Sequence, residues 1–111
     1  MPADDLACEV LRVSSLVRSG VATVSVSGEL DPFSAARLME GVGEVLRPDV
    51  GQVDIDLAGV SFVDARGFDA LIQAAGIVRR SGRRFAVSRP SRPVERIAEL
   101  LQVGDLLIST E

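Results

Sequence analysis

The sequence contains no histidine, lysine, tryptophan or tyrosine, and each absence excludes a class of chemistry. Without histidine the chain lacks the commonest general base and the usual ligand of transition metals. Without lysine it lacks the residue that completes a phosphate-binding P-loop or forms a Schiff base. Without tryptophan and tyrosine it has few side chains on which the bases of single-stranded nucleic acid stack. Together these absences favour a binding module over an enzyme.

The net charge and the cysteine content narrow the range of possible functions further. The net charge of −4 disfavours binding to the phosphate backbone of nucleic acids. The single cysteine, Cys8, has no partner for an intramolecular disulfide and cannot build a metal site, so we interpret it as a small strand residue. No apolar run approaches the ~18 residues of a membrane span, and residues 1–5 lack the apolar core of a signal peptide. We therefore expect a cytoplasmic protein with no membrane span and no cofactor.

The length and the first apolar patterns indicate one α/β domain, residues 1–111, with a single core. The stretch Leu6–Val17 is predicted to form a first strand. Apolar and hydroxyl-bearing side chains alternate along Val21–Gly28, which predicts a second strand with one dry and one wetter face. A parallel sheet covered on both faces would be apolar throughout. We therefore expect the helices mainly on one side of the sheet.

Three helices are predicted, each after a strand. The pair Asp31 and Pro32 is typical of a helix start, with the aspartate as cap and the proline at the first helical position. Asp64 is predicted to cap the second helix. Ser91 is predicted to cap the third, which ends at Gly104. The inner face of the third helix is predicted to consist of Val94, Ile97, Ala98 and Leu101.

Residues 53–67, with the sequence VDIDLAGVSFVDARG, are the most informative part of the chain. The stretch begins as a half-buried strand, and the glycine at residues 58–59 predicts a turn. An apolar run then leads to Asp64, whose carboxylate can accept the free N–H groups of a first helical turn. This order predicts an exposed corner where Asp64, Ala65 and Arg66 lie together.

Two motifs carry a family resemblance. The segment DLAGVSFVDARG at residues 56–67 resembles the DLSGVxFxDSSG motif of STAS domains, and the GELD turn at residues 28–31 resembles a second motif of that family. STAS domains occur in the cytoplasmic tails of sulphate transporters and among anti-sigma-factor antagonists. The resemblance covers nearly the whole chain. The apolar patterns also predict short strands at Phe85–Ser88 and Leu106–Ser109, which gives the order β-β-α-β-α-β-α-β. STAS domains share this order, and the resemblance implies a mixed β-sheet with α-helices packed mainly on one face.

The resemblance also implies a function. In anti-sigma-factor antagonists the residue after the second aspartate is a serine that a partner kinase phosphorylates, and the phosphate breaks the complex. That position is Ala65 here, and alanine has no hydroxyl. The implied partner is an anti-sigma factor of the ATP-binding kinase type in a bacterial partner-switching network. The implied partner-binding residues are Asp31, Ser34, Asp64, Ala65, Arg66 and Gly67. Ser61 and Ser34 are secondary candidates for a displaced phosphorylation site.

Other functions stay open. The missing serine also suits a STAS scaffold subunit of a larger assembly, such as a lipid-transport ATPase complex or a stress-signalling complex. A nucleotide-binding protein or hydrolase is a third hypothesis, although no glycine-rich loop followed by lysine is present. The edge of the first strand offers a route to a homodimer.

Two charged clusters have simple structural explanations. Asp31, Asp56 and Asp64 offer oxygen ligands suited to Mg²⁺, but the chain has no lysine and these aspartates include no pair adjacent in sequence, so we expect no metal site. We expect Asp56 to brace the loop that follows it by hydrogen bonds to the backbone. The four arginines at residues 79–84 suggest anion binding, but cations are favoured at a helix C-terminus, where these residues are predicted to lie.

Overall fold

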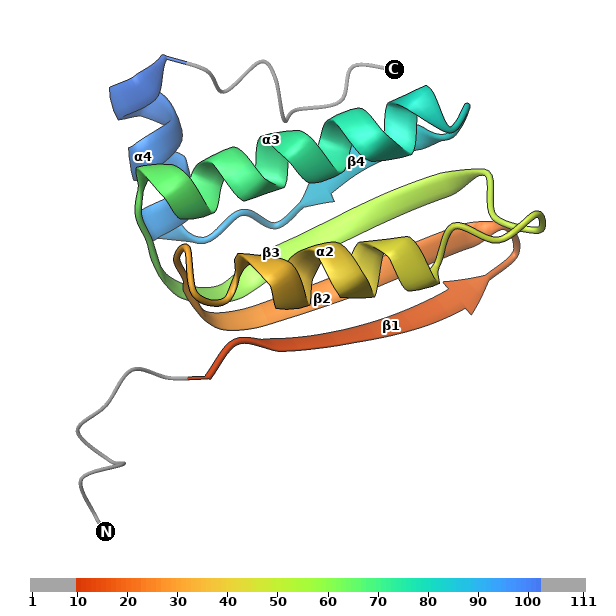
Figure 1. The fold of residues 1–111 in the computed structure, drawn as a ribbon, viewed down its shortest axis with the longest axis horizontal. Helices are drawn as coiled ribbons and strands as arrows, with labels where there is room; N and C mark the ends of the chain where they lie inside the picture. The colour runs from red at the N-terminus through yellow and green to blue at the C-terminus, as the bar shows by residue number, and fades with distance from the viewer. Residues whose placement is uncertain (1–9, 103–111) are drawn as a thin grey trace, which may run out of the picture.

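The computed structural model describes residues 10–102 and contains a four-stranded mixed sheet. The elements are, in chain order, β1 (Arg12–Arg18), β2 (Val21–Leu30), α2 (Ala35–Glu44), β3 (Gln52–Val63), α3 (Ala65–Arg80), β4 (Arg84–Ser88) and α4 (Arg92–Leu101) (Figure 1). The predicted order of elements is confirmed as far as α4. The predicted strand Leu106–Ser109, the helix stop at Gly104 and residues 6–9 of the predicted first strand lie outside the described residues.

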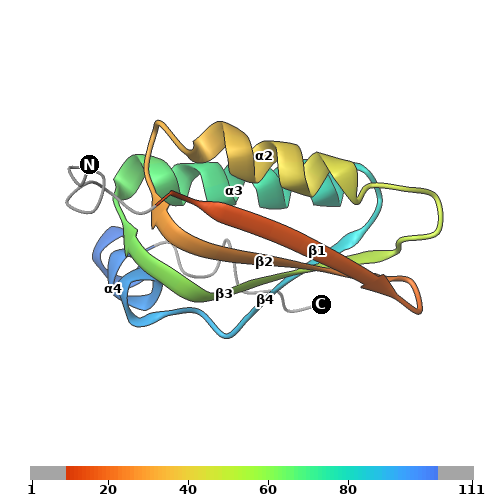
Figure 2. The same cartoon turned by 90° about the horizontal axis from the view of Figure 1, so that it is seen from below.

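The sheet has the order β1-β2-β3-β4. Strand β1 runs antiparallel to β2, whereas β2 and β3, and β3 and β4, are parallel. Helices α2 and α3 lie side by side on one face of the sheet, and α4 lies at one end, beside β3 and the start of α3 (Figure 2). The predicted mixed sheet with helices mainly on one face is confirmed. None of the helices within residues 10–102 is long and apolar enough to span a bilayer.

The core lies between the sheet and helices α2 and α3. The inward side chains of β2 and β3 are at most 2% exposed, namely Ala22, Val24, Val26, Val53, Ile55 and Leu57. The hydroxyl-bearing residues that alternate with them on β2 lie on the other face and are only half-buried. Each fully buried large side chain contributes about 1.5–3 kcal/mol. The predicted dry and wet faces of β2 are therefore confirmed.

Helix α2 begins later than the sequence predicted. Ser34 is its N-cap residue and Ala35 its first residue, whereas Asp31 had been predicted as the cap. The Asp31 carboxylate instead accepts hydrogen bonds from the backbone N–H groups of Phe33, at 2.9 Å, and Ser34, at 3.0 Å. These short-range bonds stabilise a turn over residues 31–34 in place of a first helical turn.

The predicted turn at residues 58–59 is wrong. Strand β3 is continuous through these residues, and its pairing with β2 is only locally irregular there. Gly59 serves a close approach of the two strands, because a Cβ atom at this position would lie 2.6 Å from the Cβ of Ser27. Ser91 does occupy the N-cap position of α4, but its hydroxyl makes no capping hydrogen bond.

Candidate functional site

The parallel pairing of β2 and β3 brings together Asp31 and Asp64, the residues that follow the two strands. The last residue pair of the two strands is Leu30 with Val63, so Asp31 and Asp64 leave the sheet side by side. The backbone N–H of Asp64 also donates to the Leu30 carbonyl at 3.4 Å. Both helices that follow begin at this same end of the molecule (Figure 1). Asp31 and Asp64, two of the implied partner-binding residues, therefore lie at the same end of the sheet.

Gly67 sets the distance between α3 and the end of β2. A Cβ atom on Gly67 would lie 2.2 Å from the carbonyl oxygen of Leu30 and 3.2 Å from the backbone nitrogen of Asp31. Both atoms belong to the backbone, so neither can rotate away. The first turn of α3 therefore touches the start of the 31–34 turn directly, and only glycine fits between them.

Hydrogen bonds hold the 31–34 turn in one conformation. The Ser34 hydroxyl accepts from the backbone N–H of Asp31 at 3.0 Å and donates to the carbonyl of Glu29 at 2.9 Å. Together with the two bonds to the Asp31 carboxylate, these contacts tie the turn back to the end of β2. The Ser34 hydroxyl is thus used within the fold, which makes Ser34 a poor phosphate acceptor.

The residue that follows β3, Asp64, is a regular N-cap of α3. Asp64 has an extended backbone conformation, and its carboxylate accepts from the N–H of Gly67 at 2.7 Å. Such a cap stabilises a helix by about 0.5–2 kcal/mol. The next two side chains, Ala65 and Arg66, are exposed. Arg66 forms no ion pair with any residue in the described range 10–102, so its charge faces solvent at a helix N-terminus.

Asp56 lies away from this corner, on the face of the sheet opposite α2 and α3. One carboxylate oxygen accepts from the N–H of Ala58 at 3.0 Å, as predicted, and the other pairs with Arg89 at 2.5 Å. Burial alone would raise the pKa of the Asp56 carboxyl, but the bonds from Arg89 and Ala58 and the charge of Arg89 outweigh it and lower the pKa. Within residues 10–102 no three acidic or cysteine side chains gather into a group that could hold a metal ion.

The sequence-based prediction missed two exposed phenylalanines near the corner. Phe33 projects from the 31–34 turn with 96% of its surface exposed, and Phe62 near the end of β3 is 46% exposed. The other two phenylalanines, Phe68 and Phe85, are buried in the core. The available signal was position, because Phe62 lies within the motif at residues 56–67 and Phe33 lies two residues after the motif at residues 28–31. Periodicity did not reveal the exposure, because Phe33 lies outside any helix or strand.

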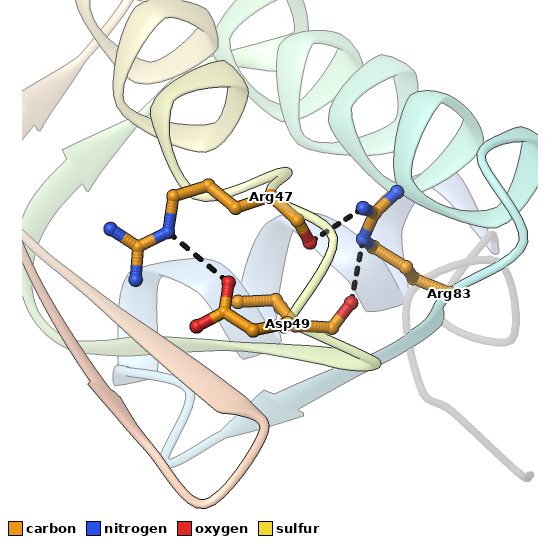
Figure 3. Close-up of polar contacts among 4 residues, drawn as sticks. Arg47, Asp49 and Arg83 are labelled. Carbon is orange, nitrogen blue, oxygen red and sulfur yellow. Dashed lines mark hydrogen bonds and ion pairs between the residues drawn. The ribbon is translucent and has the colours of Figure 1, made fainter.

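The arginine cluster predicted at the end of α3 lies at the opposite end of that helix from this corner. Arg83 donates from Nε to the Val50 carbonyl at 2.8 Å and from Nη2 to the Arg47 carbonyl at 2.7 Å (Figure 3). Arg79 lies over the ring of Phe85 at 5.4 Å. Two of the four arginines are thus engaged in structural contacts, and Arg83 closes the loop between α2 and β3.

Replacing Arg83 by alanine is expected to lower the free energy of unfolding by about 1–2 kcal/mol, because two backbone carbonyls lose a charged donor. Arg83→Lys should recover only part of this loss, since one ammonium group cannot match the fork of the guanidinium. Arg84 supplies the control, because it is exposed and forms no ion pair with the described residues. Urea unfolding followed by circular dichroism measures the difference, and equal stability of Arg83→Ala and Arg84→Ala would contradict this role.

Comparisons with known protein families and sequences identify relatives of this chain. The family model described as "Mlab, STAS domain" matches residues 14–109. The anti-sigma-F factor antagonist RsfB of Mycobacterium tuberculosis is 34% identical over 79 residues, which is 68% of this chain and 65% of the relative. The chain thus spans slightly less than two thirds of the length of this curated relative.

Solved structures have the same fold. An anti-sigma factor antagonist from Mycobacterium paratuberculosis superposes with a TM-score of 0.73 at 25% identity, over 86% of this chain and 80% of that one. The anti-sigma factor antagonist SpoIIAA, a Bacillus cell fate determinant, in its unphosphorylated form superposes with a TM-score of 0.67 over 91% of this chain and 88% of that one. At 15% identity this second likeness concerns the fold alone.

Proposed function

Because the chain belongs to the STAS domain family, we propose that it acts as an anti-sigma-factor antagonist in a bacterial partner-switching network. It binds an anti-sigma factor of the ATP-binding kinase type and so releases a sigma factor. The relatives described as anti-sigma factor antagonists support this proposal. The domain, residues 1–111, works in the cytoplasm as a binding module and not as an enzyme.

One observation carries the proposal, namely the contact between the first turn of α3 and the 31–34 turn. It gathers two carboxylates, one arginine and an exposed helix start on one corner of the molecule. We call this corner the paired-turn surface, formed by Asp31, Ser34, Asp64, Ala65, Arg66 and Gly67. Charges of both signs on a rigid backbone favour recognition of one partner orientation.

A scaffold subunit of a larger assembly is the second candidate. It is favoured by Ala65, because a subunit that is never released from its complex needs no phosphate acceptor at this position. Purification of the protein from its native host under mild conditions separates the two. An ATP-binding anti-sigma factor as companion supports the antagonist, whereas an ATPase and a permease support the scaffold.

Charge reversal at the paired-turn surface tests the proposal. Arg66→Glu is expected to weaken binding of the anti-sigma factor from the same genome at least ~tenfold, because like charges placed opposite each other cost several kcal/mol at an interface. The fold should tolerate the change, since an acidic side chain near a helix N-terminus is favoured by about 0.3–1 kcal/mol. Isothermal titration calorimetry gives the dissociation constants.

The matched control is Arg80→Glu, which makes the same change of charge on an exposed residue at the other end of α3. Its dissociation constant should stay within about twofold of the wild-type value, because exposed charges remote from an interface are screened by salt. Equal weakening by both variants would mean that net charge, not this surface, matters. Absence of binding by the wild-type protein would reject the antagonist function itself.

A further inference from the structure

Phe33 is the most exposed large apolar side chain among residues 10–102. The residue is 96% exposed, compared with 72% for Leu100 and 59% for Leu16. Single exposed apolar residues are common on protein surfaces and need no special explanation. The position and the rigidity of Phe33, however, set it apart from the other exposed apolar side chains.

The backbone that carries Phe33 is fixed on both sides. Its own N–H donates to the Asp31 carboxylate at 2.9 Å, and the Ser34 hydroxyl ties the turn to Glu29 at 2.9 Å. Pro32 precedes it and restricts the backbone further. A phenyl group has only two side-chain torsions, so little conformational entropy remains to be lost when a partner covers it.

The surroundings of Phe33 indicate what covers it. The ring projects from the turn that contains Asp31, and the first turn of α3 with Asp64 and Arg66 touches the same turn. Aromatic side chains are enriched at the centre of protein interfaces, and polar groups form the rim around that centre. A lipid surface fits less well, because the carboxylates of Asp31 in the same turn and of Asp64 at the adjoining helix start repel anionic headgroups.

We propose that Phe33 is the aromatic anchor of the paired-turn surface and inserts into an apolar pocket of the ATP-binding anti-sigma factor. This inference rests on the proposed function and identifies the chemistry of the partner site. That site is a pocket of phenyl size with hydrogen-bond donors or a cation at its rim, which meet the carboxylates of Asp31 and Asp64. Phe33 then determines which anti-sigma factor the chain binds, because a partner without the pocket leaves the ring in water.

Truncation of the ring tests the proposal. Phe33→Ala is expected to weaken binding of the purified anti-sigma factor by ~tenfold to a hundredfold in isothermal titration calorimetry, the effect of losing an interface anchor. The variant should unfold at the wild-type urea concentration, because the ring makes almost no contact within its own chain. Leu16→Ala is the matched control, since Leu16 is exposed on β1 near the other end of the sheet and should leave the affinity within about twofold.

The outcomes separate this inference from the proposed function. Unchanged affinity of Phe33→Ala, with binding still weakened by Arg66→Glu, would overturn the anchor and keep the antagonist function. Absence of wild-type binding would remove both. Sedimentation velocity tests the alternative that Phe33 contacts a second copy of the chain. If wild-type dimers dissociate in Phe33→Ala while the affinity for the anti-sigma factor is unchanged, the ring belongs to a homodimer contact and the inference is wrong.

Discussion

Gly67→Ala is expected to lower the free energy of unfolding by about 3 kcal/mol, at the upper end of what an inserted methyl group costs in a packed core. The new Cβ would lie 2.2 Å from the carbonyl oxygen and 2.7 Å from the carbonyl carbon of Leu30. Alanine is favoured over glycine in a helix by up to about 1 kcal/mol, and the clash outweighs this gain. Urea unfolding monitored by circular dichroism measures the change.

The same substitution should also disrupt the paired-turn surface. Relief of the clash requires the first turn of α3 to move away from the end of β2, which separates Asp64 from Asp31. Binding of the anti-sigma factor by the fraction that remains folded should therefore weaken at least ~tenfold, since misplaced charges lose their complementarity. The midpoint of urea unfolding and the affinity for the anti-sigma factor should therefore both fall. A surface mutation would change only the affinity.

Gly43→Ala is the control for backbone effects. Gly43 lies in the last turn of α2, and a Cβ there would meet no atom within 4 Å. This substitution should stabilise the protein by about 0.4–1 kcal/mol, because alanine restricts the unfolded chain. Equal midpoints for Gly67→Ala and the wild-type protein would contradict the close approach of α3 to β2.

The order of elements could be predicted because it depends on local patterns. The alternation on β2 predicted a strand with one buried face, and Asp64 followed by helical spacing predicted the start of α3. The juxtaposition of Asp31 and Asp64 followed from one further condition, that β2 and β3 be parallel neighbours. The core and the place of the candidate site were therefore accessible to sequence reasoning.

Features that depend on contacts distant in sequence were not accessible. The clamp formed by Arg83 joins residues 33 and 36 positions apart, and no local pattern indicates such a pair. Gly59 resembled a turn residue, because a glycine needed for the approach of two strands has the same local sequence as one needed for a turn. Asp31 was predicted to be a helix cap, but its carboxylate stabilises a separate turn before the helix. The local sequence is the same in both cases, so it could not distinguish them.

Ala65→Ser is expected to convert the protein from a chain that accepts no phosphate at this position into one that accepts about one phosphate, provided by a kinase-type anti-sigma factor with ATP. Position 65 is the first residue of α3 and is exposed. The free N–H groups and the dipole of a helix N-terminus favour a phosphate there. The nearby carboxylates of Asp31 and Asp64 oppose it, so the phosphorylated surface carries a strong excess of negative charge.

That excess charge should release the partner. Binding of phosphorylated Ala65→Ser is expected to be at least ~tenfold weaker than binding of its unphosphorylated form, because the phosphate adds nearly two negative charges to the interface. Ala36→Ser, which places a hydroxyl on an exposed alanine in the first turn of α2, should remain unphosphorylated. Peptide mass spectrometry locates the phosphate.

Phosphate on wild-type Ser61 or Ser34 would place the switch at a displaced site. An anti-sigma factor that binds Ala65→Ser but never phosphorylates it would contradict a kinase-type partner, because the hydroxyl that wild-type position 65 lacks would then be present.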